Sequence, residues 1–288
     1  MSESLLNLSA KAGLTGLAQL VADMRAAVPG IEPLLVGAMA RDLLLHHAHD
    51  VPVQRATEDV DLAFAVADWE AFLSIRAALI GSTFFQPQAN ILHTLRHRSL
   101  TPIDLIPFGG LQRADGMIAW PPSGDVVMSV VGFREAQASV IQVLLPEAQR
   151  IATVALPMFA VLKVLTWTER RTASPRKDAT DIMLVMQNYL DAGNSQRLYS
   201  VAAHLVARDD FDYEIAAAWL LGHDAAGLLR AHSAEPAAVI ERLHLILAAE
   251  ADPDGPLRLV GESGHPTPDH ARRMIAAFLN GLTGNDYP

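Results

Sequence analysis

The chain has 288 residues, 51% of them hydrophobic, and no cysteine, which is enough apolar sequence for two packed domains or one large one. The lack of cysteine excludes a disulfide framework, a thiolate metal site and a cysteine nucleophile. The formal net charge of −10 argues against a protein that coats nucleic acid, although it leaves room for a local basic groove.

The first half of the chain mixes helix and strand patterns. Apolar spacing predicts a helix over residues 14–28. A short apolar run at 33–36, closed by Gly37, predicts a strand and a tight turn that lead into a helix over 38–47. The later predicted elements are a polar turn at 48–56, strands at 59–64, 91–98 and 101–107, a helix at 69–80, a loop at 120–124, and weak strands at 126–130, 139–145 and 150–154.

The second half of the chain is predicted to be helical, because strand patterns end at Pro157. Its predicted helices cover residues 157–171, 175–192, 196–208, 213–231, 235–249 and 268–282. We place a domain boundary near residue 155. The expected fold is α+β (α/β), with a mixed-sheet domain over residues 1–155 and an all-helical domain over residues 156–288.

Three aspartates on the predicted strands form a candidate metal site. Asp59 and Asp61 are two residues apart on one strand, so their side chains share a face. Such neighbouring charges are costly unless a cation binds between them, and Asp104 on a later strand would complete an oxygen site for Mg²⁺ or Mn²⁺. Two ions about 3.5–4 Å apart support phosphoryl transfer. The alternative is a solvent-facing strand edge, but the combination with Gly37 favours the metal site.

Gly37 lies where a strand turns into a helix, which is a favourable place to bind phosphate. A glycine lets the backbone approach a ligand closely, and the start of the following helix presents N–H groups and a positive dipole end. Arg41, in the first turn of that helix, is placed to reach the same phosphates.

A lysine emerges from the most apolar helix of the second half. Lys163, Trp167 and Arg170 share one face of the 157–171 helix, and the neighbours of Lys163 are apolar. A cation in such a place needs a partner. An interhelix salt bridge with Asp178 or Asp181, which are three residues apart on the next helix, is one possibility.

Together these motifs resemble the polymerase-beta-like nucleotidyltransferase superfamily, whose signature is a Gly-Gly or Gly-Ser turn, Asp-x-Asp and a third Asp. They are most similar to the AbiEii/AbiGii (type IV toxin) nucleotidyltransferases. Ala38 departs from the pattern, because it stands where a Gly or Ser is usual, so only backbone donors remain there. The segments that carry the resemblance are 36–44, 55–61, 102–109 and 120–122, then Lys163, Trp167, Arg170 and 176–181.

The resemblance implies that a nucleoside monophosphate is transferred from an NTP to an acceptor hydroxyl, with release of pyrophosphate. In that reaction Asp59 and Asp61 would hold Mg²⁺ or Mn²⁺, while Asp104 would ligate one metal and help deprotonate the acceptor. Lys163 would act as a further catalytic residue that contacts the phosphates. The implied nucleotide-binding residues are Gly37, Ala38, Arg41, Thr57, Lys163, Arg170, Lys177, Asp178 and Asp181.

The resemblance also implies partners. The expected acceptor is RNA, including the 3′ end of tRNA, and the expected regulator is a separately encoded antitoxin. A protein or small-molecule acceptor, a CCA-adding-like enzyme and an inactive nucleotide-binding module are the alternatives, and ATP, GTP and CTP are all open as donors. We expect a cytoplasmic protein without a membrane span, because the longest apolar run is interrupted by Pro157 and Lys163.

Overall fold

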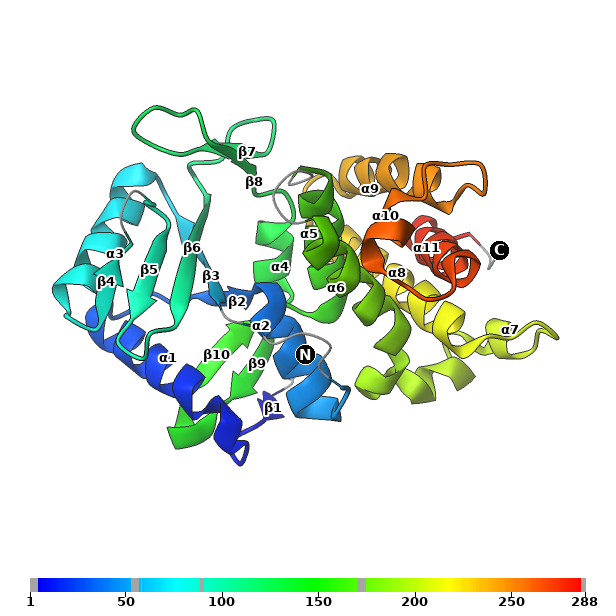
Figure 1. The fold of residues 1–288 in the computed structure, drawn as a ribbon, viewed down its shortest axis with the longest axis horizontal. Coiled ribbons are helices and arrows are strands. Elements are labelled where there is room, and N and C mark those ends of the chain that lie inside the picture. Colours follow the sequence, from blue (N-terminus) through cyan, green and yellow to red (C-terminus); the bar gives the residue numbers. More distant parts are fainter. Residues whose placement is uncertain (1–4, 53–56, 58, 89–90, 170–174, 286–288) are drawn as a thin grey trace. The chain divides into compact units, whose positions relative to one another are not determined.

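The structure is a computed structural model, and it describes residues 5–52, 57, 59–88, 91–169 and 175–285. The chain divides into two compact units, Met1–Ala155 and Leu156–Pro288. The first unit combines a sheet with helices, and the second is helical (Figure 1).

Among the described residues, the first unit contains an eight-stranded mixed sheet with the order β1-β9-β10-β2-β3-β6-β5-β4. The central strands β3 and β6 are parallel, and each has an antiparallel neighbour on its other side, β2 beside β3 and β5 beside β6. The sheet strands are β1 Leu5–Asn7, β2 Leu34–Val36, β3 Val60–Val66, β4 Phe85–Pro87, β5 Thr94–His97, β6 Pro102–Gly109, β9 Ile141–Leu144 and β10 Arg150–Thr153. A separate antiparallel pair is formed by β7 Met117–Ala119 and β8 Val127–Ser129. The mixed sheet expected from the sequence is confirmed.

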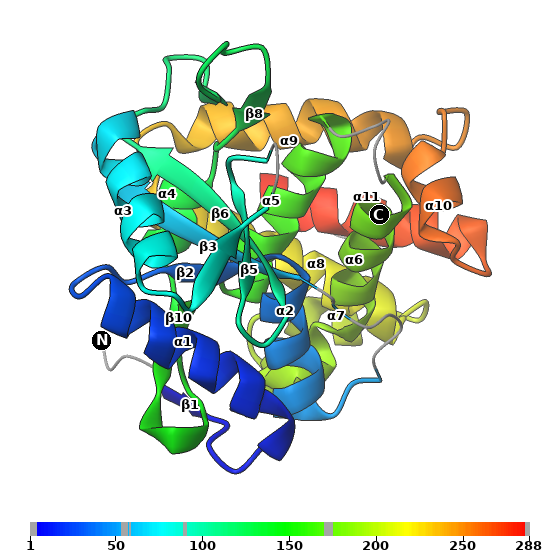
Figure 2. The ribbon, with the colours of Figure 1, turned by 60° about the vertical axis from the view of Figure 1, so that its left-hand side comes forward.

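Helices α1 (Thr15–Ala27) and α3 (Trp69–Gly81) lie side by side over one face of this sheet (Figure 2). The alternation of β3 explains the arrangement, because Leu62 and Phe64 are fully buried while Asp61 is only partly buried. Each fully buried Leu or Phe contributes about 1.5–3 kcal/mol.

The remaining helices of the unit are short. Helix α2 (Gly37–Asp42) continues into a π-helical turn over Leu43–His47 and contacts β2 and β3, whereas α4 (Phe133–Ala138) contacts β6. The strand, turn and helix predicted around Gly37 are therefore present, and α2 lies directly beside the strand that carries Asp61.

The described part of the second unit contains helices and no strands. Its helices are α5 Leu156–Glu169, α6 Pro175–Asn188, α7 Ala203–Val206, α8 Tyr213–His232, α9 Pro236–Ala251, α10 Arg258–Ser263 and α11 Pro268–Thr283. The closest pair is α8 and α11, which cross at two glycines. A Cβ on Gly222 would lie 2.0 Å from the carbonyl oxygen of Phe278, and one on Gly281 would lie 2.1 Å from that of Trp219. None of the helices in the described part of the chain has the length and apolar content that crossing a bilayer requires.

One predicted helix, 196–208, is wrong as a continuous element. The chain forms a 3-10 turn over Ser195–Tyr199 and then the single short turn of α7. The backbone leaves the helical region at Ser200, with φ −129° and ψ −79°, which ends the helical hydrogen-bond ladder there. The buried Leu198, Ala202 and Leu205 still recur at helical spacing, which is the pattern that suggested one helix.

Candidate active site

Two of the predicted catalytic aspartates lie side by side at the centre of the sheet of the first unit. Asp61 on β3 and Asp104 on β6 are direct partners in the parallel register of these strands. The row continues on both sides, because Val36 of β2 pairs with Asp61 and Thr94 of β5 pairs with Asp104. Paired residues of neighbouring strands project to the same face, so the two carboxylates share one face of the sheet.

The Asp104 carboxylate is oriented by a neighbour on the adjacent strand. Thr94 is buried, and its Oγ1 donates a 2.6 Å hydrogen bond to Oδ1 of Asp104. Sequence reasoning missed Thr94, because nothing in the local pattern marks it; the register of β5 on β6 brings it to Asp104. Asp59, the third predicted carboxylate, is partly buried and precedes β3 by one residue.

Gly37 is in contact with the carboxylate of Asp61. Its φ is +66°, and a Cβ at this position would lie 1.8 Å from Oδ2 of Asp61. Both the left-handed backbone and the close approach require glycine. Ala38, which follows it, is buried. The expected turn therefore lies directly against the expected metal ligand.

A buried carboxylate holds two of the predicted nucleotide-binding residues. Arg41 is only 2% exposed, and its Nε and Nη2 donate to Oδ1 of Asp42 at 2.8 and 2.5 Å. Thr57 donates through Oγ1 to the other oxygen, Oδ2, at 2.5 Å. Arg41 is thus engaged by Asp42 and is not presented at the surface. Asp42 was not among the expected site residues, although its position next to Arg41 in the same motif was a signal for it.

In the second unit, Lys163 of α5 forms the predicted interhelix salt bridge with both aspartates of α6. Its Nζ lies 2.7 Å from Oδ1 of Asp178 and 2.9 Å from Oδ2 of Asp181. Burial by itself lowers the pKa of Lys163, but the Asp181 and Asp178 carboxylates outweigh burial and raise this pKa above its ordinary value. The ammonium is therefore charged at neutral pH and fixed between two buried carboxylates.

The other predicted residues of the second unit lie apart from this ion pair or outside the described residues. Trp167 is buried and donates from Nε1 to Oε2 of Glu262 at 2.5 Å, so it belongs to the helical core. Lys177 is exposed at the start of α6. Arg170 lies outside the described residues.

The oxygen ligands of Asp61 and Asp104, together called the carboxylate row, suit a hard divalent cation. Within the part of the chain that the structure describes, no three His, Asp or Glu side chains converge into a ready-made metal cluster. Asp61 and Asp104 are nevertheless adjacent in register, and the Thr94 hydrogen bond engages one oxygen of Asp104. Carboxylate oxygens are the ligands that Mg²⁺ and Mn²⁺ prefer. Asp61 and Asp104 are therefore the pair whose chemistry fits such an ion.

Comparison with known proteins adds a family to this geometry. The family model described as "Nucleotidyl transferase AbiEii toxin, Type IV TA system" matches residues 26–283. Among solved structures, the solution structure of the antibiotic-resistance factor ANT(2″)-Ia is similar, with 14% identity and a TM-score of 0.37, over 67% of this chain and 99% of that one. No curated protein sequence is significantly similar to the chain.

The family match begins within α1 and ends at the last residue of α11. It therefore includes both units, the row of Asp61 and Asp104, and the ion pairs of Lys163. The chain belongs to the AbiEii family of nucleotidyltransferase toxins of type IV toxin–antitoxin systems.

Proposed function

We propose that this nucleotidyltransferase transfers a nucleoside monophosphate from an NTP to a hydroxyl at an RNA 3′ end, in a reaction that depends on Mg²⁺ or Mn²⁺. The observation that carries the proposal is the pairing of Asp61 with Asp104 in the register of β3 and β6, with Gly37 against Asp61. Membership of a type IV toxin–antitoxin family implies an NTP substrate and an antitoxin partner.

In the proposed reaction, the acceptor oxygen forms a bond to the α-phosphorus of the NTP, and the bond from that phosphorus to the bridging oxygen breaks, so pyrophosphate leaves. Asp104, held by Thr94, takes the proton of the acceptor hydroxyl. Asp59, Asp61 and Asp104 would hold the divalent ions, which when bound neutralise charge on the triphosphate and lower the pKa of the acceptor hydroxyl. Gly37 and Ala38 would present backbone N–H groups to the phosphates.

The second unit is proposed to contribute Lys163 as a phosphate contact. Asp178 and Asp181 would hold its ammonium in place, which reduces the freedom that a long side chain loses on binding. Lys177 and Arg170 are proposed as further nucleotide contacts. Arg41 and Thr57 are proposed as further nucleotide-binding residues whose side chains Asp42 positions.

The acceptor is tested by label transfer. The purified enzyme is incubated with each α-labelled NTP, with total cellular RNA or total cellular protein, and with Mg²⁺ or EDTA. We expect label in RNA, a preference for one NTP, and no label with EDTA. Label in protein alone would contradict the RNA acceptor, and no label with any NTP would contradict the transferase activity.

The site is tested by Asp61→Asn. Loss of one carboxylate from the paired row should abolish pyrophosphate release while the melting temperature stays near that of the wild type. The matched control is Asp115→Asn, which removes an exposed carboxylate of the same unit and should leave the rate unchanged. Retained activity in Asp61→Asn would overturn the assignment.

A further inference from the structure

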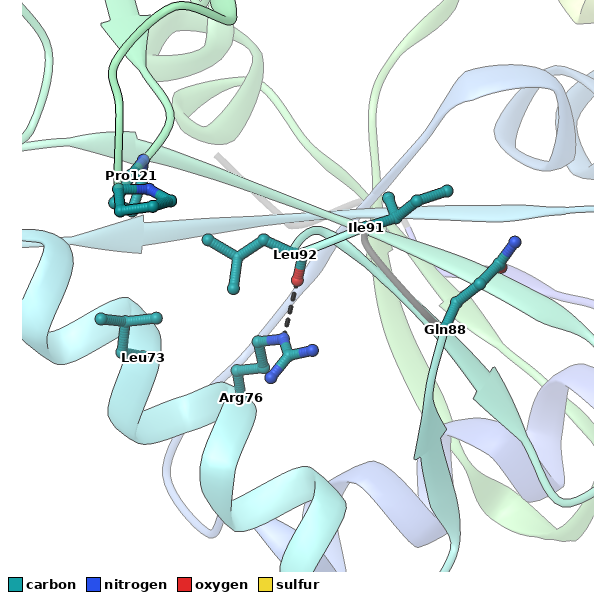
Figure 3. Close-up of a pocket in the computed structure, with 7 residues that line it drawn as sticks. Leu73, Arg76, Gln88, Ile91, Leu92 and Pro121 are labelled. Carbon is teal, nitrogen blue, oxygen red and sulfur yellow. Dashed lines mark hydrogen bonds between the residues drawn. The ribbon is translucent and has the colours of Figure 1, made fainter.

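A cavity of about 440 Å³ opens in the first unit beside α3, and its lining residues include none of the site residues described above (Figure 3). A volume in this range holds a nucleotide-sized ligand. Its walls are largely apolar, with one amide from Gln88 and one guanidinium from Arg76. The apolar lining residues are Leu73, Ile91, Leu92, Pro121 and Pro122.

Arg76 is the only charged residue among those that line the described cavity, and one of its nitrogens is anchored to the backbone. Its Nε donates a 2.7 Å hydrogen bond to the carbonyl oxygen of Leu92. The two terminal amino groups of the guanidinium point away from that carbonyl (Figure 3). A guanidinium held in this way can receive a phosphate group with both amino groups.

One wall of the cavity belongs to the same chain segment as Thr94, the residue that is bonded to Asp104. Leu92 precedes Thr94 by two residues, which span at most about 7 Å, and Thr94 is bonded to Asp104. The intervening His93 accepts a 2.8 Å hydrogen bond from the backbone N–H of Leu105, the residue after Asp104. The Leu92 side of the cavity is therefore tied, through Thr94 and His93, to the strand that carries Asp104.

The wall formed by Pro121 and Pro122 contacts the same segment through the neighbouring Trp120. Trp120, next to Pro121, is buried, and its ring packs on that of His93 with the centroids 5.0 Å apart. This ring contact links the proline side of the cavity to the segment of Leu92, and both sides are apolar. An unstacked base binds between apolar side chains, and RNA is read mostly through such splayed bases.

We propose that this cavity binds one unpaired nucleotide of the RNA acceptor, with its base against Leu73, Leu92 and the two prolines and its phosphate on Arg76. The proposal rests on the RNA-directed transfer proposed above. The donor NTP is assigned to Gly37 and the carboxylate row, so the cavity adds a contact for the acceptor alone.

The test compares Arg76→Gln with a matched control, Arg134→Gln. Arg134 is an arginine of the same unit that also donates to a backbone carbonyl, that of Gly109, and it is not one of the cavity residues. The binding of a short single-stranded oligoadenylate RNA is measured by fluorescence anisotropy without NTP. Label transfer then gives separate KM values for total RNA and for the NTP.

We expect Arg76→Gln to weaken oligonucleotide binding by about tenfold and to raise the KM for RNA in step, because a hydrogen-bonded charge contact is lost. The salt dependence of binding should also fall by about 0.7 in the log–log slope, the share of one phosphate contact on a single strand. The KM for the NTP should stay unchanged. The Arg134→Gln variant, which also loses a hydrogen bond to a backbone carbonyl, should show a similar small fall in melting temperature but bind the oligonucleotide as the wild type does.

Three outcomes would overturn the subsite: wild-type protein that does not bind the oligonucleotide, Arg76→Gln that binds it as tightly as the wild type, or a rise in the KM for the NTP alone. The subsite would also be overturned if a protein acceptor displaced the oligonucleotide while Arg76→Gln left label transfer to RNA unaffected. If the wild type binds the oligonucleotide but transfers no label, the proposed function fails while the subsite stands.

Discussion

At Gly37 the backbone lies directly against the carboxylate of Asp61, and a substitution there tests this contact. In Gly37→Ala the new methyl group would overlap Oδ2 of Asp61, which lies 1.8 Å from the Cβ position, while the backbone keeps a φ of +66°. We expect a loss of about 1–3 kcal/mol in the free energy of unfolding together with a loss of transfer, because Asp61 must move.

The matched control for this prediction is Gly30→Ala. Gly30 also has a positive φ, +85°, but no atom lies within 4 Å of its Cβ position. The control should therefore lose about 1–2 kcal/mol from the backbone conformation alone and keep its transfer rate. Urea unfolding and pyrophosphate release measure the two effects. Equal transfer rates for the two variants would show that the contact with Asp61 does not matter for activity.

The hydroxyl of Thr57 supports a second prediction at this scale. Thr57→Val keeps the shape of the side chain but removes the hydrogen bond to Asp42, and Thr57→Ser keeps the hydroxyl. We expect the valine variant to lose about 1.5–3 kcal/mol, the value of a hydrogen bond to a charged group, and to have a lower kcat. The serine variant should retain both stability and kcat. If Thr57→Val kept the wild-type kcat, the hydrogen bond between Thr57 and Asp42 would serve stability and not activity.

These residues show which parts of the site the sequence can predict. The pair of carboxylates could be predicted from the sequence, because Asp61 and Asp104 each stand inside a local strand pattern. The parallel pairing of β3 and β6 then brings them together. Thr94 was missed as a site residue, since it acquires its role from Asp104 on the next strand, which a local pattern does not indicate. Asp42 was missed although Arg41 stands beside it, because its second partner, Thr57, lies fifteen residues on.

At the scale of elements, one buried cation links α5 to α6. Lys163 has a 17% exposed side chain, and its two carboxylate partners are 8% and 1% exposed. In Lys163→Met the two aspartates lose their common partner. We expect a loss of about 3–5 kcal/mol in the free energy of unfolding, as for other buried pairs that lose one member. The control is Arg242→Met, which breaks the more exposed pair with Glu169 in the same unit and should cost about 1 kcal/mol or less.

The pH dependence of this loss follows from the pKa of Lys163. The pKa is raised in the folded state above its ordinary value of 10.5, because the carboxylates outweigh burial. The stabilisation is fully present below the unfolded-state pKa and is lost as pH rises through the folded-state pKa. The difference in unfolding free energy between the wild type and Lys163→Met should therefore be constant from neutral pH to about pH 9 and shrink above pH 10.5. A difference that shrinks already near neutral pH would contradict the assigned ion pairs.

The prediction of helices and strands succeeded where the apolar pattern was long. It failed for short segments that form a strand only by pairing with another strand. Helices α1, α3, α8 and α11 span three or more turns, and their apolar spacing was read correctly. Strands β1, β4 and β7 have three residues each and were missed, because such a short run has no period of its own, whereas the equally short β2 was predicted from an apolar run that Gly37 closes. The break at Ser200 was missed for a related reason, since buried residues keep helical spacing across it.

At the scale of the whole molecule, each unit has its own buried core. In the first, the core lies between the sheet and the helices α1 and α3; in the second, α8 and α11 meet at Gly222 and Gly281. A region with its own buried core can fold alone. We therefore propose that residues 156–288 form an independent domain and that residues 1–155 are the nucleotidyltransferase domain.

The independence of the helical unit is tested by expressing residues 156–288 alone. We expect a helical far-ultraviolet circular dichroism spectrum and a cooperative thermal transition, because the contacts of Lys163, Trp167 and the α8–α11 crossing all lie within this unit. Lys163→Met should lower the stability of the fragment by the same amount as in the full chain, since its partners are all present. A fragment without a cooperative transition would show that this core needs the first unit. A fragment that folds but is unaffected by Lys163→Met would show that the stabilising effect of Lys163 depends on the rest of the chain.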